Sequence, residues 1–388
     1  NPTSALHFKA EPRDTIVEEG GPARLDCLAT SAFGIVTIQW RSEDGQLINF
    51  IGDDFRSQLS NGSLYISNVY NNNPETIGKY QCLASVENIG AIVSRTVEIR
   101  VAKLPNFIEE PQDILVHPGQ ITYLSCKLPI NDDRVKIQWL RDEHPLSFDE
   151  SRMTIMPSGA LEIDDTRSLD VGTYRCNVSG FGEFRLSSKA QLNLLSSDLA
   201  EVSSPPNFVA RPSHQVAIEG STITLECAAN GYPRPRIAWL KDGIAIDFAA
   251  LDSRYRKFAA SSLMITDIME EDHGSYQCRA ENQVETLDAV AQVSVQVPPR
   301  FMKRPQDKVA NKNQDLEFEC DIYGKPEPKV TWLKNGEQIT LSEYWQLVNG
   351  NNLRINGLLA IDAGIFQCIG ANPAGSIQAS ARLTINQP

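Results

Sequence analysis

The sequence predicts an all-β protein made of four β-sandwiches in tandem, and two observations lead to this prediction. The eight cysteines fall into four successive pairs whose members are about 50 residues apart, a repeat of roughly 95 residues. Each pair encloses one tryptophan roughly a dozen residues after its first cysteine. The pairs and their tryptophans are Cys27 and Cys82 with Trp40, Cys126 and Cys176 with Trp139, Cys227 and Cys278 with Trp239, and Cys320 and Cys368 with Trp332.

The segments around these residues have the pattern of short strands. "RIAWLKDG" (236–243) and "KVTWLKNG" (329–336) alternate around the tryptophan and end in a hairpin turn signal. This Cys–Trp–Cys spacing is that of an immunoglobulin-type sandwich, where the disulfide joins strands B and F and the tryptophan of strand C packs on it. The predicted E strands are "GSLYIS" (62–67), "GALEI" (159–163), "SLMIT" (262–266) and "NLRIN" (352–356), and short loops favour the intermediate set of such domains.

The residues before each second cysteine predict a tyrosine corner. Tyr80, Tyr174 and Tyr276 lie two residues before that cysteine, where the hydroxyl bonds to the backbone upstream. Phe366 occupies the fourth position, so we expect that corner to lack this hydrogen bond. A glycine lies two residues before each of these aromatic residues. Two residues before that glycine, domains 2 to 4 have an aspartate (Asp170, Asp272 and Asp362), whereas domain 1 has Thr76.

These landmarks divide the chain into four domains and one long linker. The domains are residues 1–101, 102–195, 208–298 and 299–388, and the linker is 196–207. Twelve residues span about 40 Å when extended, whereas a sandwich is roughly 20–25 Å across. Two arrangements therefore remain open: domain 3 lies antiparallel beside domain 2, which brings domain 4 to domain 1, or the linker is a flexible spacer between two pairs.

Composition and motifs exclude several classes of function. The formal net charge of −13, from 36 basic and 49 acidic residues, argues against a nucleic-acid binder. The cysteines lack the close spacing of metal ligands, and no catalytic or phosphate-binding motif occurs, so we expect no metal, no cofactor and no enzyme. Four disulfides indicate an oxidising compartment, so we expect an extracellular or luminal protein. No run of 18 apolar residues and no signal peptide is present, as in a mature secreted protein or a fragment of one.

Two sequons and two basic clusters are the remaining candidate surface sites. Asn61 and Asn177 begin the sequons Asn-Gly-Ser and Asn-Val-Ser. The basic clusters are either anion sites for heparan sulfate or an acidic protein, or ordinary solvated faces. The acidic stretch "IMEEDHG" (268–274) has the pattern of a solvated turn. The basic residues are Arg254, Arg256 and Lys257 in domain 3, and Lys325, Lys329 and Lys334 in domain 4.

Five local strings are distinctive of one family: "QLSNGSLYI" (58–66), "IVSRTVEIRVA" (92–102), "PSGALEI" (157–163), "RPSHQVAIEG" (211–220) and "WQLVNGNNLRI" (345–355). In these strings and their order, the sequence resembles the four N-terminal immunoglobulin domains in the ectodomain of netrin receptors of the Deleted in Colorectal Cancer/neogenin/Frazzled family. The resemblance implies a horseshoe with domain 1 on domain 4 and domain 2 on domain 3. It also implies a parent receptor anchored in the plasma membrane outside this segment, with fibronectin type III modules that make the main netrin contact.

The expected function is therefore recognition of an extracellular ligand by a segment of an axon-guidance receptor, with a netrin-like secreted protein or another extracellular protein as partner. The alternative is a homophilic adhesion module, in which one copy pairs with another. The fold alone leaves the ectodomain of a receptor kinase open, but the local strings disfavour it. A monomer that binds a secreted cue supports the first hypothesis, and self-association supports the second.

Overall fold

The computed structural model describes residues 6–195, 202–249 and 254–386. These residues form short β-strands and three-residue 3₁₀ turns, and within these ranges there is no α-helix. The strands build four sandwiches, so the all-β fold class predicted from the cysteine and tryptophan repeat is correct.

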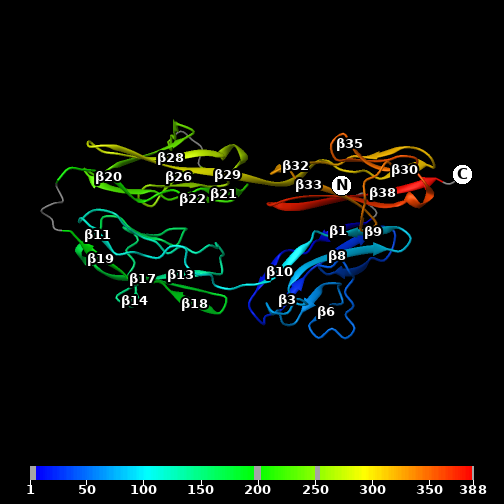
Figure 1. Cartoon of the computed structure of the whole chain (residues 1–388), viewed down its shortest axis with the longest axis horizontal. Helices are drawn as coiled ribbons and strands as arrows, with labels where there is room; N and C mark the ends of the chain where they lie inside the picture. The colour runs from blue at the N-terminus through cyan, green and yellow to red at the C-terminus, as the bar shows by residue number, and fades with distance from the viewer. Residues whose placement is uncertain (1–5, 196–201, 250–253, 387–388) are drawn as a thin grey trace. The chain divides into compact units, whose positions relative to one another are not determined.

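Contacts divide the chain into two compact units. The first unit is Asn1–Ala102 together with Val297–Pro388, and the second is Lys103–Gln296. The first unit therefore holds domains 1 and 4, drawn in blue and in orange to red, and the second holds domains 2 and 3 (Figure 1).

Domain 1 has a sheet of order β2-β10-β8-β5, with β9 also on β8, and a sheet of order β3-β7-β6. Strand β1 pairs with β4. Its strands are β1 (Leu6–Ala10), β2 (Thr15–Val17), β3 (Ala23–Leu25), β4 (Leu28–Ser31), β5 (Thr37–Arg41), β6 (Arg56–Gln58), β7 (Leu64–Ile66), β8 (Gly78–Val86), β9 (Gly90–Val93) and β10 (Val97–Val101).

Domain 2 repeats this plan with the order β11-β19-β17-β13-β14, where β18 also pairs with β17, and β12-β16-β15. The 3₁₀ turn η1 (Ser168–Asp170) precedes β17. Its strands are β11 (Ile114–Val116), β12 (Thr122–Leu124), β13 (Lys136–Arg141), β14 (His144–Pro145), β15 (Met153–Ile155), β16 (Leu161–Ile163), β17 (Gly172–Gly180), β18 (Glu183–Leu186) and β19 (Ala190–Leu194).

Domain 3 has the order β21-β29-β28-β24-β25, the order β22-β27-β26, and the pair β20-β23. The turn η3 (Glu270–Asp272) precedes β28. Its strands are β20 (Ser204–Ala210), β21 (Gln215–Ile218), β22 (Ile223–Leu225), β23 (Ala228–Tyr232), β24 (Arg236–Lys241), β25 (Ile244–Ala245), β26 (Tyr255–Phe258), β27 (Ser262–Ile265), β28 (Gly274–Glu281) and β29 (Thr286–Lys303).

Domain 4 has the order β30-β38-β37-β33-β34 and the order β31-β36-β35, and β32 pairs with the end of β29. The turn η4 (Ala360–Asp362) precedes β37. Its strands are β30 (Lys308–Asn311), β31 (Leu316–Phe318), β32 (Asp321–Lys325), β33 (Lys329–Lys334), β34 (Glu337–Gln338), β35 (Trp345–Val348), β36 (Asn352–Ile355), β37 (Gly364–Asn372) and β38 (Gly375–Asn386).

The linker region is only partly described. Strand β20 begins at Ser204, and Asn207 pairs with Asn230 of β23, so residues 204–207 are strand rather than free connection. The remaining stretch of the predicted linker, residues 196–201, lies outside the described residues.

Each sandwich has its own core around the disulfide and the tryptophan. Strand alternation explains which residues enter it, as β28 shows: Tyr276, Cys278 and Ala280 are fully buried, whereas Gln277 and Arg279 between them point to the other face. The outer faces of these strands are therefore the surfaces on which contacts between domains are built.

Candidate functional site

The predicted disulfides and core tryptophans occupy the same place in all four sandwiches. The bonds join Cys27 to Cys82, Cys126 to Cys176, Cys227 to Cys278, and Cys320 to Cys368. The tryptophans are 1 to 4% exposed. Each indole N–H also donates to a backbone carbonyl just before the E strand: Trp40 to Gly62, Trp139 to Gly159, Trp239 to Ser261, and Trp332 to Asn351.

The tyrosine corners form in three domains. The hydroxyl of Tyr80 donates to the Glu75 carbonyl at 2.8 Å, that of Tyr174 to Asp170 at 2.5 Å, and that of Tyr276 to Asp272 at 2.6 Å. In domain 4 Phe366 is fully buried and stacks on Phe318, with ring centroids 5.1 Å apart. The fourth corner keeps the ring and has no hydroxyl to donate.

In domains 2 and 3 the aspartates before the corner are buried ion-pair partners rather than members of a solvated turn. In domain 2 Arg152 donates to both oxygens of Asp170 at 2.8 and 3.1 Å, and their side chains are 6% and 0% exposed. In domain 3 Arg254 does the same to Asp272 at 2.5 and 3.1 Å. The expectations that Arg254 belongs to a surface patch and that Asp272 is solvated are corrected, because each is the partner of the other inside the domain.

Domain 4 uses a tyrosine where domains 2 and 3 use an arginine. The hydroxyl of Tyr344 donates to Asp362, which also accepts from the Leu359 amide. Tyr344 is not among the residues predicted from the sequence, although a signal exists: Arg152, Arg254 and Tyr344 each lie 18 residues before the aspartate that they bind.

Domains 1 and 4 meet through an apolar surface inside the first unit. Leu83 and Val93 of domain 1 are buried with Leu333 of domain 4, and Ile369 packs against them. At the edge, the Arg41 guanidinium donates to the Gly336 carbonyl at 2.8 Å and to Glu337 at 2.8 Å. Gly336 has a φ of 81°, and a Cβ there would lie 2.7 Å from Leu83, so glycine permits both the turn and this approach.

One amide side chain continues the hydrogen-bond ladder across this contact. Gln367 of β37 is fully buried; its Oε1 accepts from the Val93 amide at 2.9 Å and its Nε2 donates to the Val93 carbonyl at 2.6 Å. We call this two-point contact the Gln367 clamp. Because both polar backbone groups of Val93 are satisfied by the other domain, separation would leave buried groups to be rehydrated.

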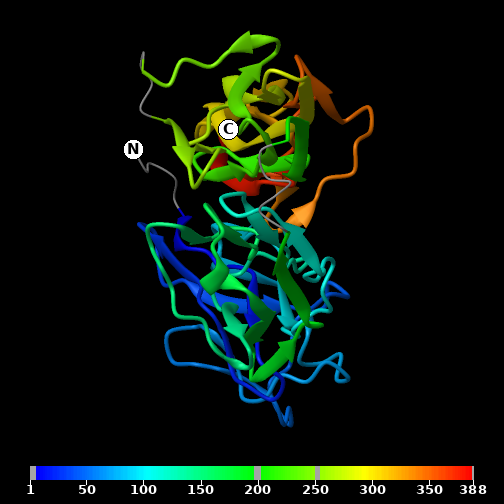
Figure 2. The same ribbon diagram turned by 90° about the vertical axis from the view of Figure 1, so that its left-hand side faces the viewer.

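Domains 2 and 3 lie side by side in the second unit (Figure 2). An amide side chain joins them in a similar way. Asn230 of β23 accepts from the Ile121 amide at 2.8 Å and donates to the Ile121 carbonyl at 2.9 Å, which we call the Asn230 clamp. Ile121 is buried with Ala210 and Ala228 of domain 3. An exposed ion pair, Arg234 with Asp164 at 3.0 Å, lies at the same contact.

Carboxylates also take part in the contact between domains 2 and 3. Glu226 accepts from the Tyr123 hydroxyl and from Ser158, both at 2.8 Å. Glu162 is 2% exposed; its Oε1 accepts from the Ala260 amide at 2.9 Å, and its Oε2 is buried without a partner. Burial raises the pKa of Glu162 to about 7.

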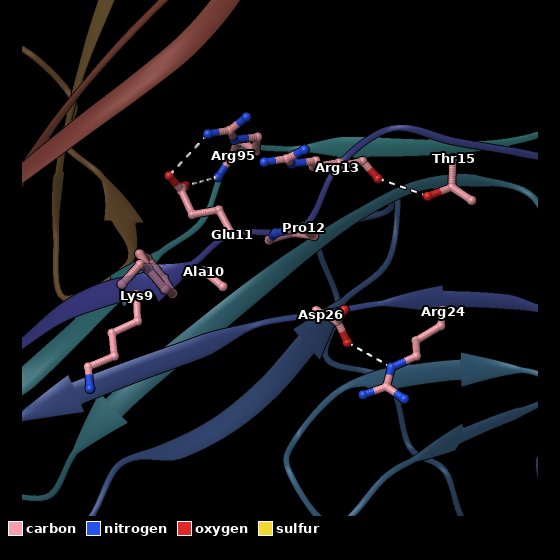
Figure 3. Close-up of a pocket in the computed structure, with 10 residues that line it drawn as sticks. Lys9, Ala10, Glu11, Pro12, Arg13, Thr15, Arg24, Asp26 and Arg95 are labelled. Atoms are coloured by element: carbon pink, nitrogen blue, oxygen red, sulfur yellow. Dashed lines mark hydrogen bonds and ion pairs between the residues drawn. The ribbon is translucent and has the colours of Figure 1, made fainter. Parts of the chain in front are cut away.

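A polar pocket of about 580 Å³ lies in domain 1 around the turn after β1 (Figure 3). Arg95 binds Glu11 at 3.4 Å and Arg24 binds Asp26 at 2.8 Å, so two of its cations are neutralised within the pocket. Lys9 and Arg13 form no ion pair in the described part of the chain. The pocket is an exposed polar surface with an excess of positive charge, which sequence analysis did not single out.

The described residues contain no group of three or more His, Cys, Asp or Glu side chains placed to hold a metal ion. A search of the same ranges finds no helix that is long and apolar enough to cross a membrane.

The model of the immunoglobulin I-set domain matches residues 105–193, 206–295 and 299–385. The chain belongs to the immunoglobulin I-set family. These three ranges are domains 2, 3 and 4, and domain 1 has the same sheet orders without falling in a matched range.

Beyond the I-set match, the chain is a homologue of netrin receptors over its whole length. It is 38% identical to neogenin of Rattus norvegicus over 98% of the chain, and 36% identical to netrin receptor DCC of Rattus norvegicus over 100%. It spans 27% of the length of each. The four N-terminal immunoglobulin domains of Dscam1 isoform 7.44 have a similar structure, with a TM-score of 0.78, 26% identity and 99% of both chains covered. As I-set domains of this family, the chain is not an enzyme.

The two sequons lie in different surroundings, Asn61 in domain 1 and Asn177 in domain 2. Asn61 is exposed in the turn before β7, where its Oδ1 accepts from the Ser63 amide at 3.0 Å. Asn177 is half-buried on β17, and its Oδ1 is buried without a partner.

The basic clusters are smaller than the sequence suggested. In domain 3 Arg256 and Lys257 are exposed, and the Lys257 ammonium lies 5.4 Å from the centre of the Phe248 ring. In domain 4 Lys325 and Lys329 are exposed, whereas Lys334 donates to the Ile361 carbonyl at 2.5 Å, and burial lowers its pKa. Arg254 and Lys334 therefore serve the structure of their own domains, which leaves two basic residues in each cluster on the surface.

Proposed function

We propose that this chain is an extracellular ligand-recognition and scaffolding segment of a cell-surface receptor of the netrin-receptor class. The observation that supports it is the identity of 36 to 38% with netrin receptor DCC and neogenin, maintained over 98 to 100% of the chain. The four disulfides are in keeping with an extracellular location. Because the chain spans 27% of those relatives, its partners do not follow from theirs.

We further propose that the four domains form a horseshoe. Within each unit the two domains are held by an apolar contact and by an amide clamp, which supports a chain that turns back between domains 2 and 3. The likeness to the four-domain Dscam1 segment over 99% of both chains supports the same arrangement. In a horseshoe the apolar strand faces of domains 1 and 4 are used internally, and ligands meet the remaining surfaces.

The net charge of −13 bears on the kind of ligand. An acidic surface steers basic extracellular proteins and repels acidic ones. We therefore propose a basic secreted protein, such as a netrin-like cue, as the partner class. Heparan sulfate would bind only at the exposed lysines and arginines.

The test is a binding panel of secreted guidance proteins, measured by surface plasmon resonance with this segment alone and with the segment extended through further ectodomain modules. We expect the segment to sediment as a monomer in analytical ultracentrifugation. We also expect it to bind at least one cue by itself, or the extended protein to bind that cue more tightly when the segment is present. A tight dimer without ligand binding would instead establish a homophilic adhesion module.

A further inference from the structure

One pair of positions on the outer face of the sandwich recurs in all four domains, and its environment differs between them. The first position directly follows the second disulfide cysteine, and the second lies opposite it on the next strand along the chain. The pairs are Leu83 with Val93, Asn177 with Leu186, Arg279 with Asp288, and Ile369 with Gln378. In domains 1 and 4 the apolar members pack against each other across the contact, and in domain 3 the pair is an ion pair at 2.9 Å.

Domain 2 is the one case, among the described residues, in which apolar side chains at this place stay exposed. Leu186 is 42% exposed, and Phe184, two residues before it on β18, is 70% exposed. A shallow hollow of about 470 Å³ has both side chains on its wall and lies beside β18. Exposed apolar side chains that lie next to one another indicate a surface that another group covers.

The sequon of domain 2 lies on the same two strands and the same face. Asn177 is directly opposite Leu186, and Ser179 is directly opposite Phe184. Opposed residues in an antiparallel pair have Cβ atoms about 5 Å apart and diagonal ones about 7–8 Å, so Asn177 adjoins both apolar side chains. The Oδ1 atom of Asn177 is buried without a partner, and its Nδ2 forms no hydrogen bond with any residue that the structure describes.

We propose that Asn177 carries an N-linked glycan whose first sugars lie across Leu186 and Phe184 and seal this face of domain 2. In the transfer, Asn177 Nδ2 forms a bond to C1 of the first N-acetylglucosamine, the bond from C1 to a lipid-linked diphosphate breaks, and the diphosphate leaves as Nδ2 loses a proton. The C–H face of a pyranose is apolar and packs on an aromatic ring, whose negative face attracts it. The glycan occupies the place that domain 4 occupies on domain 1.

A second copy of the chain is the weaker occupant. Across β17 from the sequon, Gln138 and Lys136 lie opposite Asn177 and Ser179, and both are exposed. Two apolar side chains bordered by polar ones offer much less area than the roughly 800 Å² per partner that a stable interface buries. A sugar chain, with one apolar face and a hydroxyl rim, matches such a mixed surface.

Hydroxyl-radical footprinting of the segment secreted from eukaryotic cells tests the proposal. Mass spectrometry first establishes whether Asn177 carries a glycan. It then measures the oxidation rates of Phe184 and Leu186 in four samples: the intact glycoprotein, the glycoprotein trimmed to a single N-acetylglucosamine, and the variants Asn177→Gln and Ser179→Ala. We expect oxidation to rise about threefold in both variants, because stacking on the ring is lost, and to stay low after trimming.

The controls separate this effect from unfolding. Asn61→Gln removes the other sequon and leaves Phe184 oxidation unchanged, and Phe148, 41% exposed in the same domain, reports on the fold in every sample. Complete enzymatic deglycosylation of the folded protein replaces the variants if they are not secreted. An unoccupied Asn177, or equal oxidation of Phe184 with and without the glycan, would overturn the proposal.

Discussion

At the scale of single residues, we expect Glu162 to make the contact between domains 2 and 3 depend on pH. Its carboxyl is buried, accepts one hydrogen bond from the Ala260 amide, and faces the negative charges of Asp164 and Glu226 and the positive charge of Arg234. Burial and the two acids raise its pKa from 4.5 to about 7, so the folded state holds the proton more tightly than the unfolded chain does.

A carboxyl with a raised pKa destabilises the folded state as pH increases. The free energy of unfolding of the unit of domains 2 and 3 should fall between about pH 5 and pH 7 and level off above, by up to about 3 kcal/mol. Glu162→Gln keeps the acceptor for the Ala260 amide and removes the charge. We expect it to match the wild type at pH 5 and to melt at a higher temperature at pH 8.

Thermal melts across this range, followed by calorimetry, measure the effect. The exposed Glu150→Gln serves as the matched control and should leave the pH dependence unchanged. Parallel melting curves for wild type and Glu162→Gln would contradict the assignment.

A second residue-scale feature is the buried pair of Arg152 and Asp170. Arg152→Met removes the cation and leaves an uncompensated carboxylate that is 0% exposed. We expect a loss of about 3–5 kcal/mol in the free energy of unfolding of domain 2. Denaturant titration measures this loss, and the double variant with Asp170→Asn should recover part of it. A loss below about 1 kcal/mol in Arg152→Met would show that water compensates the charge of Asp170.

At the scale of elements, the two amide clamps decide how strands of different domains meet. Gln367 of β37 holds both backbone groups of Val93, and Asn230 of β23 holds both of Ile121. A long-range pair of this kind has no signature in local sequence, because an outward-facing glutamine or asparagine on a strand is ordinary.

Gln367→Ala should expose the Val93 amide to exchange. The loss of two buried hydrogen bonds is worth about 1–3 kcal/mol, which predicts roughly 5- to 150-fold faster hydrogen exchange at Val93. Gln277→Ala, at the corresponding position of β28 in domain 3, is the control and should leave Val93 protected. Unchanged protection of Val93 in Gln367→Ala would mean that apolar packing alone closes the contact.

At the scale of the whole molecule, the proposed horseshoe depends on both contacts together. Two rows of two sandwiches, each about 35 Å long and roughly 22 Å across, have a radius of gyration of about 25 Å. Four such sandwiches in line give about 40 Å. We expect small-angle X-ray scattering to report a value close to that of the two rows for the wild type and a clear increase for Gln367→Ala combined with Asn230→Ala.

The measurement also has an outcome that argues against the proposed arrangement. An elongated profile for the wild-type chain would show that the contacts do not hold in solution, and Gln277→Ala again serves as the reference for a substitution outside them. Ligands would then bind to a segment whose domains do not fold back on one another.

The four sandwiches and the four disulfides are predictable from the amino-acid sequence, because they follow from spacing along the chain: one Cys–Trp–Cys set per repeat, and alternation within each strand. The three tyrosine corners are predictable in the same way, and local strings indicate the family. The folded arrangement was needed to see that Arg254 and Lys334 turn inward, that Tyr344 replaces an arginine, and that Glu162, Gln367 and Asn230 lie at domain contacts. Those roles depend on which distant strand a side chain meets, and local sequence does not record that partner.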